Sequence, residues 1–233
     1  MLQDGKHRLS IAKLLQLKSI PVAVGFRHQQ WVKFRNEIQS FCNKRGSAYQ
    51  PFTHPDLQDF PVHHDDKREK DIEDKIPNKP GSLLDLGSYF GYFCCYFTKI
   101  GWKCTAVEHH KMHSYFIKRL ADAEDLNINV LTMSLFEIPD REFDVVLALN
   151  IFHHYLKTKD LFNQLTKFLN TLTVNEQMYL ETHHPKDPIM NESYKNFEPR
   201  DFANYVASNT DLPKITFLRK TTRNRQLYLL EKA

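Results

Sequence analysis

Short apolar runs alternate with amphipathic segments along residues 82–232. Each run is bounded by polar or glycine-containing stretches, as is typical of strands buried in a parallel sheet. The pattern therefore predicts βα units, in which each strand is followed by a helix that crosses back over the sheet. The predicted strands are 82–86, 103–107, 128–132, 143–149 and 177–181, and the predicted helices between them are 92–100, 113–123 and 160–171.

Two more apolar runs, 214–219 and 226–231, close this part of the chain and are separated by the polar segment Lys-Thr-Thr-Arg-Asn-Arg. The connection is too short for a crossover helix, so the two runs predict an antiparallel hairpin. We therefore expect an α/β fold: a Rossmann-like, doubly wound, mostly parallel seven-stranded sheet with a terminal antiparallel hairpin and a helical N-terminal extension. Ligands bind such sheets at the carboxyl ends of the strands, where a functional site is expected.

The chain divides into three zones by composition. Residues 1–44 form an N-terminal extension, expected to hold a strand at 20–24 and a helix at 28–43. That helix places four apolar side chains on one face, where we expect core packing: Trp31, Phe34, Ile38 and Phe41. Residues 45–80 are rich in proline and charge and predict a linker with one helix at 65–75. Residues 81–233 form the α/β domain.

Composition narrows the class of protein. Hydrophobic residues make up 41% of the chain, with 17 Phe and 10 Tyr, which excludes a disordered chain. The formal net charge of +4 permits an anionic partner such as RNA without arguing for one. No apolar run is long enough to span a bilayer, and the first residues lack the apolar core of a signal peptide, so we expect a cytoplasmic protein with no membrane partner. The four cysteines lack zinc or redox spacing and are expected to be reduced thiols.

The main candidate for a ligand-binding segment is residues 81–97, GSLLDLGSYFGYFCCYF. Here the sequence predicts a buried strand that runs through a tight turn into an apolar helix. Gly87 can take a positive φ and leaves the backbone open to a ligand, and Gly91 lets the helix start close to the strand. The alternative is an ordinary βα turn with two glycines. The segment resembles motif I of class I S-adenosylmethionine-dependent methyltransferases, roughly D/E-x-G-x-G-x-G, with Tyr89 at the middle glycine. Its G-S-x-x-G-Y-F form is similar to tRNA wobble-uridine carboxymethyltransferase-like enzymes. Tyr89 argues against a dinucleotide, whose pyrophosphate needs glycine there.

Three further sequence features follow motif I, in the order that they have in that superfamily. Glu108 ends a strand 23 residues after Asp85, where a carboxylate can accept hydrogen bonds from ribose hydroxyls. Ser134 and Leu135 follow the third strand, at the position that often touches the adenine. Residues 142–155, EFDVVLALNIFHHY, resemble motif IV. The resemblance implies S-adenosylmethionine as the cofactor, surrounded by Asp85, Gly87, Ser88, Tyr89, Gly91, Glu108, Ser134, Leu135 and Asn150.

Histidines supply the candidate catalytic groups. His153 and His154 follow the fourth strand, and either could act as a general base, because imidazole titrates near neutral pH. The alternative is that they only pack around the cofactor pocket. Glu181 and His183 could orient a substrate, although a structural role is favoured. No metal is expected, because neighbouring residues seldom point to one centre.

The N-terminal extension carries a second, weaker resemblance. Residues 4–24 begin Asp-Gly-Lys-His-Arg-Leu, which is similar to the nucleotide-handling loop of ParB/sulfiredoxin-like folds. The segment is then either a remnant of a longer protein or a coincidence, the plain alternative being a solvated helix start. By analogy with methyltransferases, residues 28–76 are expected to cap the substrate as a lid.

The sequence thus predicts methyl transfer from S-adenosylmethionine to a small-molecule or sugar-bearing acceptor. Basic residues are dispersed and no RNA-binding module is present, so a small-molecule acceptor is favoured over RNA, and DNA is not expected. The alternatives are an RNA (tRNA)-modifying methyl- or carboxymethyltransferase and a non-catalytic binding module with the same fold.

Overall fold

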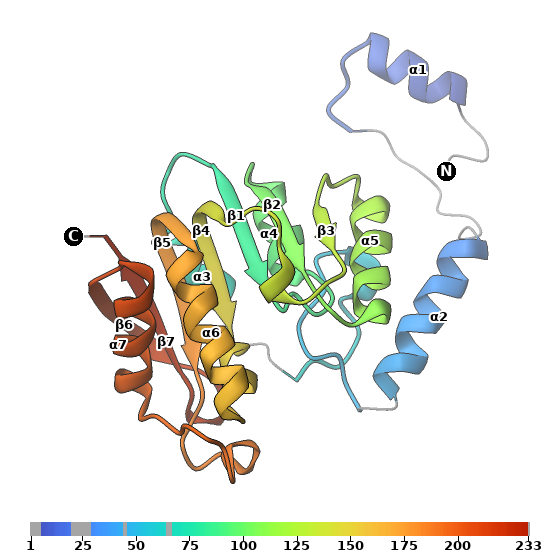
Figure 1. The fold of residues 1–233 in the computed structure, drawn as a ribbon. Helices are drawn as coiled ribbons and strands as arrows, with labels where there is room; N and C mark the ends of the chain where they lie inside the picture. The colour runs from blue at the N-terminus through green and yellow to red at the C-terminus, as the bar shows by residue number, and fades with distance from the viewer. Residues whose placement is uncertain (1–5, 20–28, 44–45, 64–66, 233) are drawn as a thin grey trace. The chain divides into compact units, whose positions relative to one another are not determined.

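The computed structural model describes residues 6–19, 29–43, 46–63 and 67–232 (Figure 1). It divides into two compact units, Met1–Gly46 and Ser47–Ala233. The first unit contains the helices α1 (Lys6–Leu14) and α2 (Gln29–Asn43). Phe34 and Ile38 of α2 are buried as expected. His7 and Arg8 belong to α1, and the strand expected at 20–24 lies outside the described residues.

The second unit is built on one seven-stranded sheet with the order β3-β2-β1-β4-β5-β7-β6. The strands β1 to β5 are all parallel, whereas β7 pairs antiparallel with both β5 and β6. This confirms the Rossmann-like sheet with a terminal hairpin. The strands are β1 (Ser82–Leu86), β2 (Lys103–Val107), β3 (Asn129–Leu131), β4 (Glu142–Leu149), β5 (Thr173–Thr182), β6 (Lys214–Lys220) and β7 (Gln226–Glu231).

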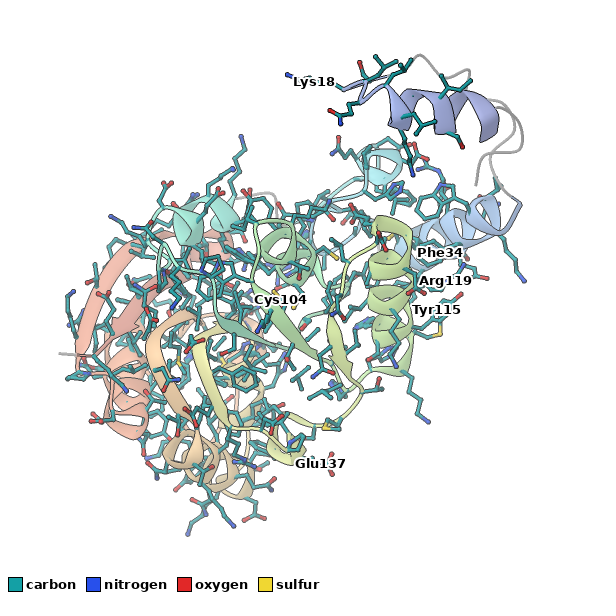
Figure 2. The ribbon with its side chains drawn as sticks, turned by 90° about the horizontal axis from the view of Figure 1, so that it is seen from above. Lys18, Phe34, Cys104, Tyr115, Arg119 and Glu137 are labelled. Carbon is teal, nitrogen blue, oxygen red and sulfur yellow. The ribbon has the colours of Figure 1, made fainter. Side chains whose placement is uncertain are left out.

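Helices cover both faces of the sheet and enclose two apolar cores. One core contains residues of α6 and α7, and the other contains residues of α3, α4 and α5. In Figure 1, α6 and α7 lie in front of the sheet and α3 and α4 behind it. Side chains fill the space between the layers, with Cys104 of β2 in the interior (Figure 2). These helices are α3 (Arg68–Glu73), α4 (Tyr92–Lys99), α5 (Lys111–Glu124), α6 (Lys159–Thr171) and α7 (Pro199–Thr210).

Short 3-10 helices shape the loops between these elements. Three of them lie in loops at the carboxyl ends of strands: η2 after β3, η3 after β4 and η4 after β5. Within the described residues the 3-10 helices are η1 (Pro55–Leu57), η2 (Leu135–Glu137), η3 (Phe152–Leu156), η4 (Pro188–Met190) and η5 (Thr222–Asn224). No helix in the described part of the chain is long and apolar enough to cross a membrane.

Candidate active site

The turn between β1 and α4 depends on two glycines with positive φ. Gly87 has a φ of +73°, and a Cβ there would come within 2.7 Å of the Ile151 side chain. Gly91 has a φ of +77°, and its Cβ would come within 2.9 Å of Ile117 in α5. Both positions therefore need glycine for conformation and for space. The space at Gly87 is occupied by the loop that follows β4, which draws that loop against the turn.

Tyr89 shows how the turn accommodates a side chain where the superfamily has glycine. Its φ is +54°, so it keeps the left-handed conformation that glycine adopts easily. Its ring is buried in an aromatic cluster, stacked on Phe90 with a centroid distance of 3.9 Å. The rings of Tyr49 and His113 pack edge-on against it, at 5.4 and 4.6 Å. This packing offsets the cost of the left-handed backbone.

Glu108 is joined to this turn directly. The side chain is buried, and its Oε2 accepts a hydrogen bond from the Tyr89 backbone N–H at 3.0 Å. Its Oε1 accepts one from the His110 N–H at 2.8 Å. Burial alone would raise the pKa of Glu108, but the hydrogen bonds from His113, His110 and Tyr89 outweigh it and lower the pKa. The group is thus an ionised carboxylate at the end of β2, and its two oxygens retain lone pairs for further donors.

Asp85 lies beneath the same turn. Its side chain is 2% exposed, and Oδ2 is 3.8 Å from the thiol of Cys94 in α4. The hydroxyl of Ser88 donates to the Asp85 backbone carbonyl at 2.8 Å, which closes the turn. Burial raises the pKa of Asp85 to about 7, against the opposing hydrogen bonds of Ser88 and Cys94. The structure therefore brings Asp85, Ser88, Tyr89 and Glu108 together at one turn.

Asn150 follows β4 and is linked to the turn through a residue that the sequence did not single out. Its φ is +60°, and its Nδ2 donates to the hydroxyl of Tyr49, whose ring packs on Tyr89. The Asn150 Oδ1 is buried and has no hydrogen-bond partner among the described residues. A buried acceptor of this kind is suited to a donor on a ligand. Tyr49 was missed because it lies in a loop-rich segment with no motif.

Ser134 and Leu135 form the start of η2. The Ser134 hydroxyl accepts from the Phe136 N–H, while the Ser134 N–H donates to the Glu137 carboxylate at 3.1 Å. This is a capping box, which fixes the turn; Glu137 is labelled in Figure 2. Leu135 is buried in the core beside it. These contacts shape the loop after β3, next to the strand that leads to Glu108.

The two histidines after β4 differ in how far the whole residue is exposed. His153 is buried and His154 is exposed, with ring centroids 4.0 Å apart. Burial, followed by the charges of His154 and Arg225, lowers the pKa of His153 to about 2. The pKa of His154 is also lowered, chiefly by desolvation and then by the charge of Lys157. Both imidazoles are neutral at pH 7.

Several buried polar side chains lie where β5 ends and β7 begins. Glu181 forms a buried ion pair with Arg68 of α3 at 2.9 Å and also accepts from Thr221. His183 is buried, with its Nε2 3.2 Å from Asn196 Oδ1. Arg225 was missed, because the hairpin turn gave no reason to expect a buried arginine. No three His, Cys, Asp or Glu side chains among the described residues are placed to hold a metal ion.

Comparisons with known proteins found a matching family model and similar folds. A family model described as a methyltransferase domain matches residues 84–171. A comparison with curated proteins gave no significant match. Among solved structures, WbdD, described as a bifunctional kinase-methyltransferase, is similar with a TM-score of 0.67 at 17% identity, over 83% of this chain and 41% of that chain.

Two further solved structures match a smaller part of this chain. The PH0226 protein from Pyrococcus horikoshii OT3 matches with a TM-score of 0.52 at 16% identity, over 71% of this chain and 90% of that chain. A protein described under the conversion of a disulfide bond into a thioacetal group during echinomycin biosynthesis matches with a TM-score of 0.53 at 13% identity, over 71% and 80%.

The likeness to these structures is one of fold, and the chain spans less than half of the length of WbdD, 41–48% in the first two structures. The family match covers β1 to α6, which includes the glycine turn, Glu108, Asn150 and the histidine pair. The methyltransferase-domain model thus matches the segment that holds the candidate site, within a Rossmann-like sheet.

Proposed function

We propose that the protein transfers a methyl group from S-adenosylmethionine to a small-molecule or sugar-bearing acceptor. The observation that carries the proposal is Glu108: a buried, ionised carboxylate at the end of β2 whose oxygen holds the backbone of the glycine turn. Such a carboxylate has lone pairs for the two hydroxyls of a ribose. S-adenosylmethionine supplies a methyl group on a positively charged sulfur.

The other groups suit the remaining parts of that cofactor. The free Asn150 Oδ1 can accept a hydrogen bond from an ammonium group, because it is buried and has no partner among the described residues. Ser88 holds its small side chain against the Asp85 backbone carbonyl, so it places no bulk over the turn. Ser134 and Leu135 are proposed to line the adenine end through the loop that they shape.

For the proton of the acceptor, His154 is better suited than His153. A base with a pKa of about 2 binds a proton too weakly to take one from a hydroxyl or amine, and His153 is in that state. His154 is exposed at the same edge of the sheet and can meet a substrate. We therefore assign proton acceptance to His154 and a positioning role to His153, through the contact of their rings.

Calorimetry with S-adenosylhomocysteine tests the cofactor site. Glu108→Gln removes a charged acceptor, and a charged hydrogen bond contributes about 1.5–3 kcal/mol, so we expect binding to weaken at least about tenfold. Glu176→Gln, an exposed acid in β5, is the matched control and should bind like the wild type. Equal affinity in Glu108→Gln and the wild type would refute the site. If the protein binds a carboxylated form of S-adenosylmethionine more tightly than S-adenosylmethionine itself, carboxymethyl transfer would be favoured.

Turnover tests the proposed reaction. Labelled methyl transfer into cell extract, separated into metabolite and RNA fractions, should label the metabolite fraction. His154→Ala should lower turnover and leave S-adenosylhomocysteine affinity unchanged, whereas His153→Ala should lower turnover less. Label in RNA would support the RNA-modifying alternative, and cofactor binding without any transfer would support the binding module. Unchanged turnover in both histidine variants would remove them from the mechanism.

A further inference from the structure

Arg225, between η5 and β7, is a buried cation whose hydrogen bonding is incomplete. Its side chain is 3% exposed, and its Nε and Nη1 have no hydrogen-bond partner among the residues that the structure describes. Its Nη2 is 3.4 Å from Asp187 Oδ2, which is long for a charged hydrogen bond. Guanidinium offers five N–H donors, and buried donors in native proteins are nearly always paired. The unpaired N–H groups of Arg225 can therefore donate hydrogen bonds to a further acceptor.

The sheet places this arginine on the acceptor side of the candidate active site. Gln226 pairs with Thr182 in the antiparallel register of β5 and β7, so Arg225 lies beside the end of β5, where His183 follows. The next strand is β4, which ends at Asn150 and the histidine pair, and β1 with the glycine turn lies beyond it. Arg225 thus lies at the same edge of the sheet as the glycine turn after β1, and β4 and β5 lie between them.

The groups around Arg225 make this corner positive. Burial contributes most to the low pKa values of His153 and His183, and the charges of Arg225 and Lys157 lower them further. The half-buried Lys157 reaches this loop, and its Nζ donates to Ser193 at 3.1 Å. In the described part of the chain, Asp187 is the acid that forms an ion pair with Arg225. One long ion pair leaves a surplus of buried positive charge, which an anion would relieve.

We propose that Arg225 binds an anionic group, a carboxylate or a phosphate, on the methyl acceptor. The inference rests on the proposed methyl transfer and narrows its acceptor class to small anionic molecules. A guanidinium binds two oxygens of such an anion along one edge, either Nε with Nη2 or Nη1 with Nη2. Nε and Nη1 have no partner among the described residues, so each edge offers one unpaired nitrogen beside Nη2, whose contact with Asp187 is long. With the anion held beside β5 and β7, the rest of the acceptor extends over β4 toward His154.

The competing explanation is that Arg225 only holds the loop after β5 through Asp187. The two explanations differ in what Asp187→Asn does. Asn keeps the cap of η4, where the Asp187 carboxylate accepts from the Ile189 N–H, but loses the charge that competes with an anion. Anion binding should then tighten by at least twofold. A purely structural pair predicts a less stable protein with no gain in anion affinity.

Calorimetric titration with inorganic phosphate and with malonate, at constant ionic strength in chloride, measures the site. Wild type should bind at least one of these probes, and the stronger probe identifies the group as phosphate or carboxylate. Arg225→Gln should bind it at least tenfold more weakly, whereas Arg223→Gln should stay within twofold. Arg223 is the matched control, because it is an exposed arginine in the same turn. Binding of neither probe by the wild type, or equal binding by all three proteins, overturns the proposal.

Two controls separate this site from the cofactor site and from misfolding. S-adenosylhomocysteine should bind Arg225→Gln as it binds the wild type, and phosphate should not displace it. Displacement would mean that the anion occupies the cofactor site, which overturns the assignment to the acceptor. If the wild type fails to bind S-adenosylhomocysteine but binds anions through Arg225, the proposed methyl transfer fails and the anion site stands. If Arg225→Gln does not fold, Arg225→Lys should bind anions more weakly than the wild type, and an unchanged affinity refutes the site.

Discussion

Asp85 shows how the burial of a single residue of the turn makes the stability of the fold depend on pH. Its carboxyl group is buried, and burial holds its pKa at about 7, well above the ordinary value of 3.8. A folded-state pKa above the unfolded one means that the protonated form stabilises the fold. That contribution is complete below pH 3.8 and is lost as the pH rises through 7. The ionised form of Asp85, which a cationic ligand would favour, is thus the form that burial destabilises.

Asp85→Asn should therefore gain stability relative to the wild type as the pH rises. Between pH 4 and 7 the difference in unfolding free energy should shift in favour of the variant by up to about 1.4 kcal/mol per pH unit. Urea unfolding at several pH values measures it, and Asp140→Asn, an exposed acid, is the control. The same variant should bind S-adenosylhomocysteine more weakly. A difference in stability that is constant with pH would contradict this account.

Gly91→Ala tests the other half of the turn, where φ is +77° and the new Cβ would lie 2.9 Å from Ile117. Gly46→Ala is the matched control, because Gly46 has a φ of +81° and no described residue lies within 4 Å of the new Cβ. Left-handed strain alone costs about 1 kcal/mol in both, and the contact adds to it only at position 91. Thermal unfolding should therefore show a larger loss for Gly91→Ala. Equal losses would mean that α5 yields without cost.

At the scale of elements, a buried ion pair fixes α3 to the sheet. Arg68 and Glu181 lie 2.9 Å apart with side chains 2% and 1% exposed, and the guanidinium also stacks on Phe93 of α4. Two charges removed from water this completely depend on each other, because neither has solvent to replace the partner. Such a pair adds little to stability in total but makes the loss of one partner costly.

Glu181→Gln should lower the free energy of unfolding by about 3–5 kcal/mol, because it removes one charge of a buried ion pair. Replacing both residues by methionine should restore most of the loss. Lys214→Gln breaks an exposed pair with Glu231 and should cost less than about 1 kcal/mol. Chemical denaturation of the four proteins gives these values. A double variant that is less stable than Glu181→Gln would show that the pair itself holds α3.

Elements with strong local signals could be predicted from sequence, and contacts between elements could not. β1 and β2 have the predicted bounds, because glycine and charged residues end their apolar runs. α7 was missed, since only Phe202 and Val206 of its buried face are large apolar residues, and two alanines and a threonine beside them give a weak periodic signal. Tyr49 and Arg225 reach the candidate site only through tertiary packing, which no spacing along the chain reveals.

At the scale of the whole molecule, the buried ionisable groups combine into one pH dependence. His153 and His183 have pKa values of about 2 and 4 in the folded protein, against 6.5 ordinarily. Below pH 6.5 the unfolded chain takes up protons at these two residues that the folded protein refuses. Each histidine therefore lowers the free energy of unfolding by up to about 1.4 kcal/mol per pH unit on acidification. Asp85 acts in the opposite direction over the same range.

Two histidines against one aspartate leave a net loss, so the wild type should lose about 2 kcal/mol of stability between pH 6.5 and 5. His153→Gln should remove most of that loss. In the double variant with His183→Gln, Asp85 acts with less opposition, and stability should rise on acidification. Urea midpoints across this range, with the exposed His109→Gln as control, give the slopes. An unchanged slope in both variants would mean that these histidines accept protons in the folded protein, so that neither burial nor the nearby charges of Arg225 and Lys157 keep them neutral.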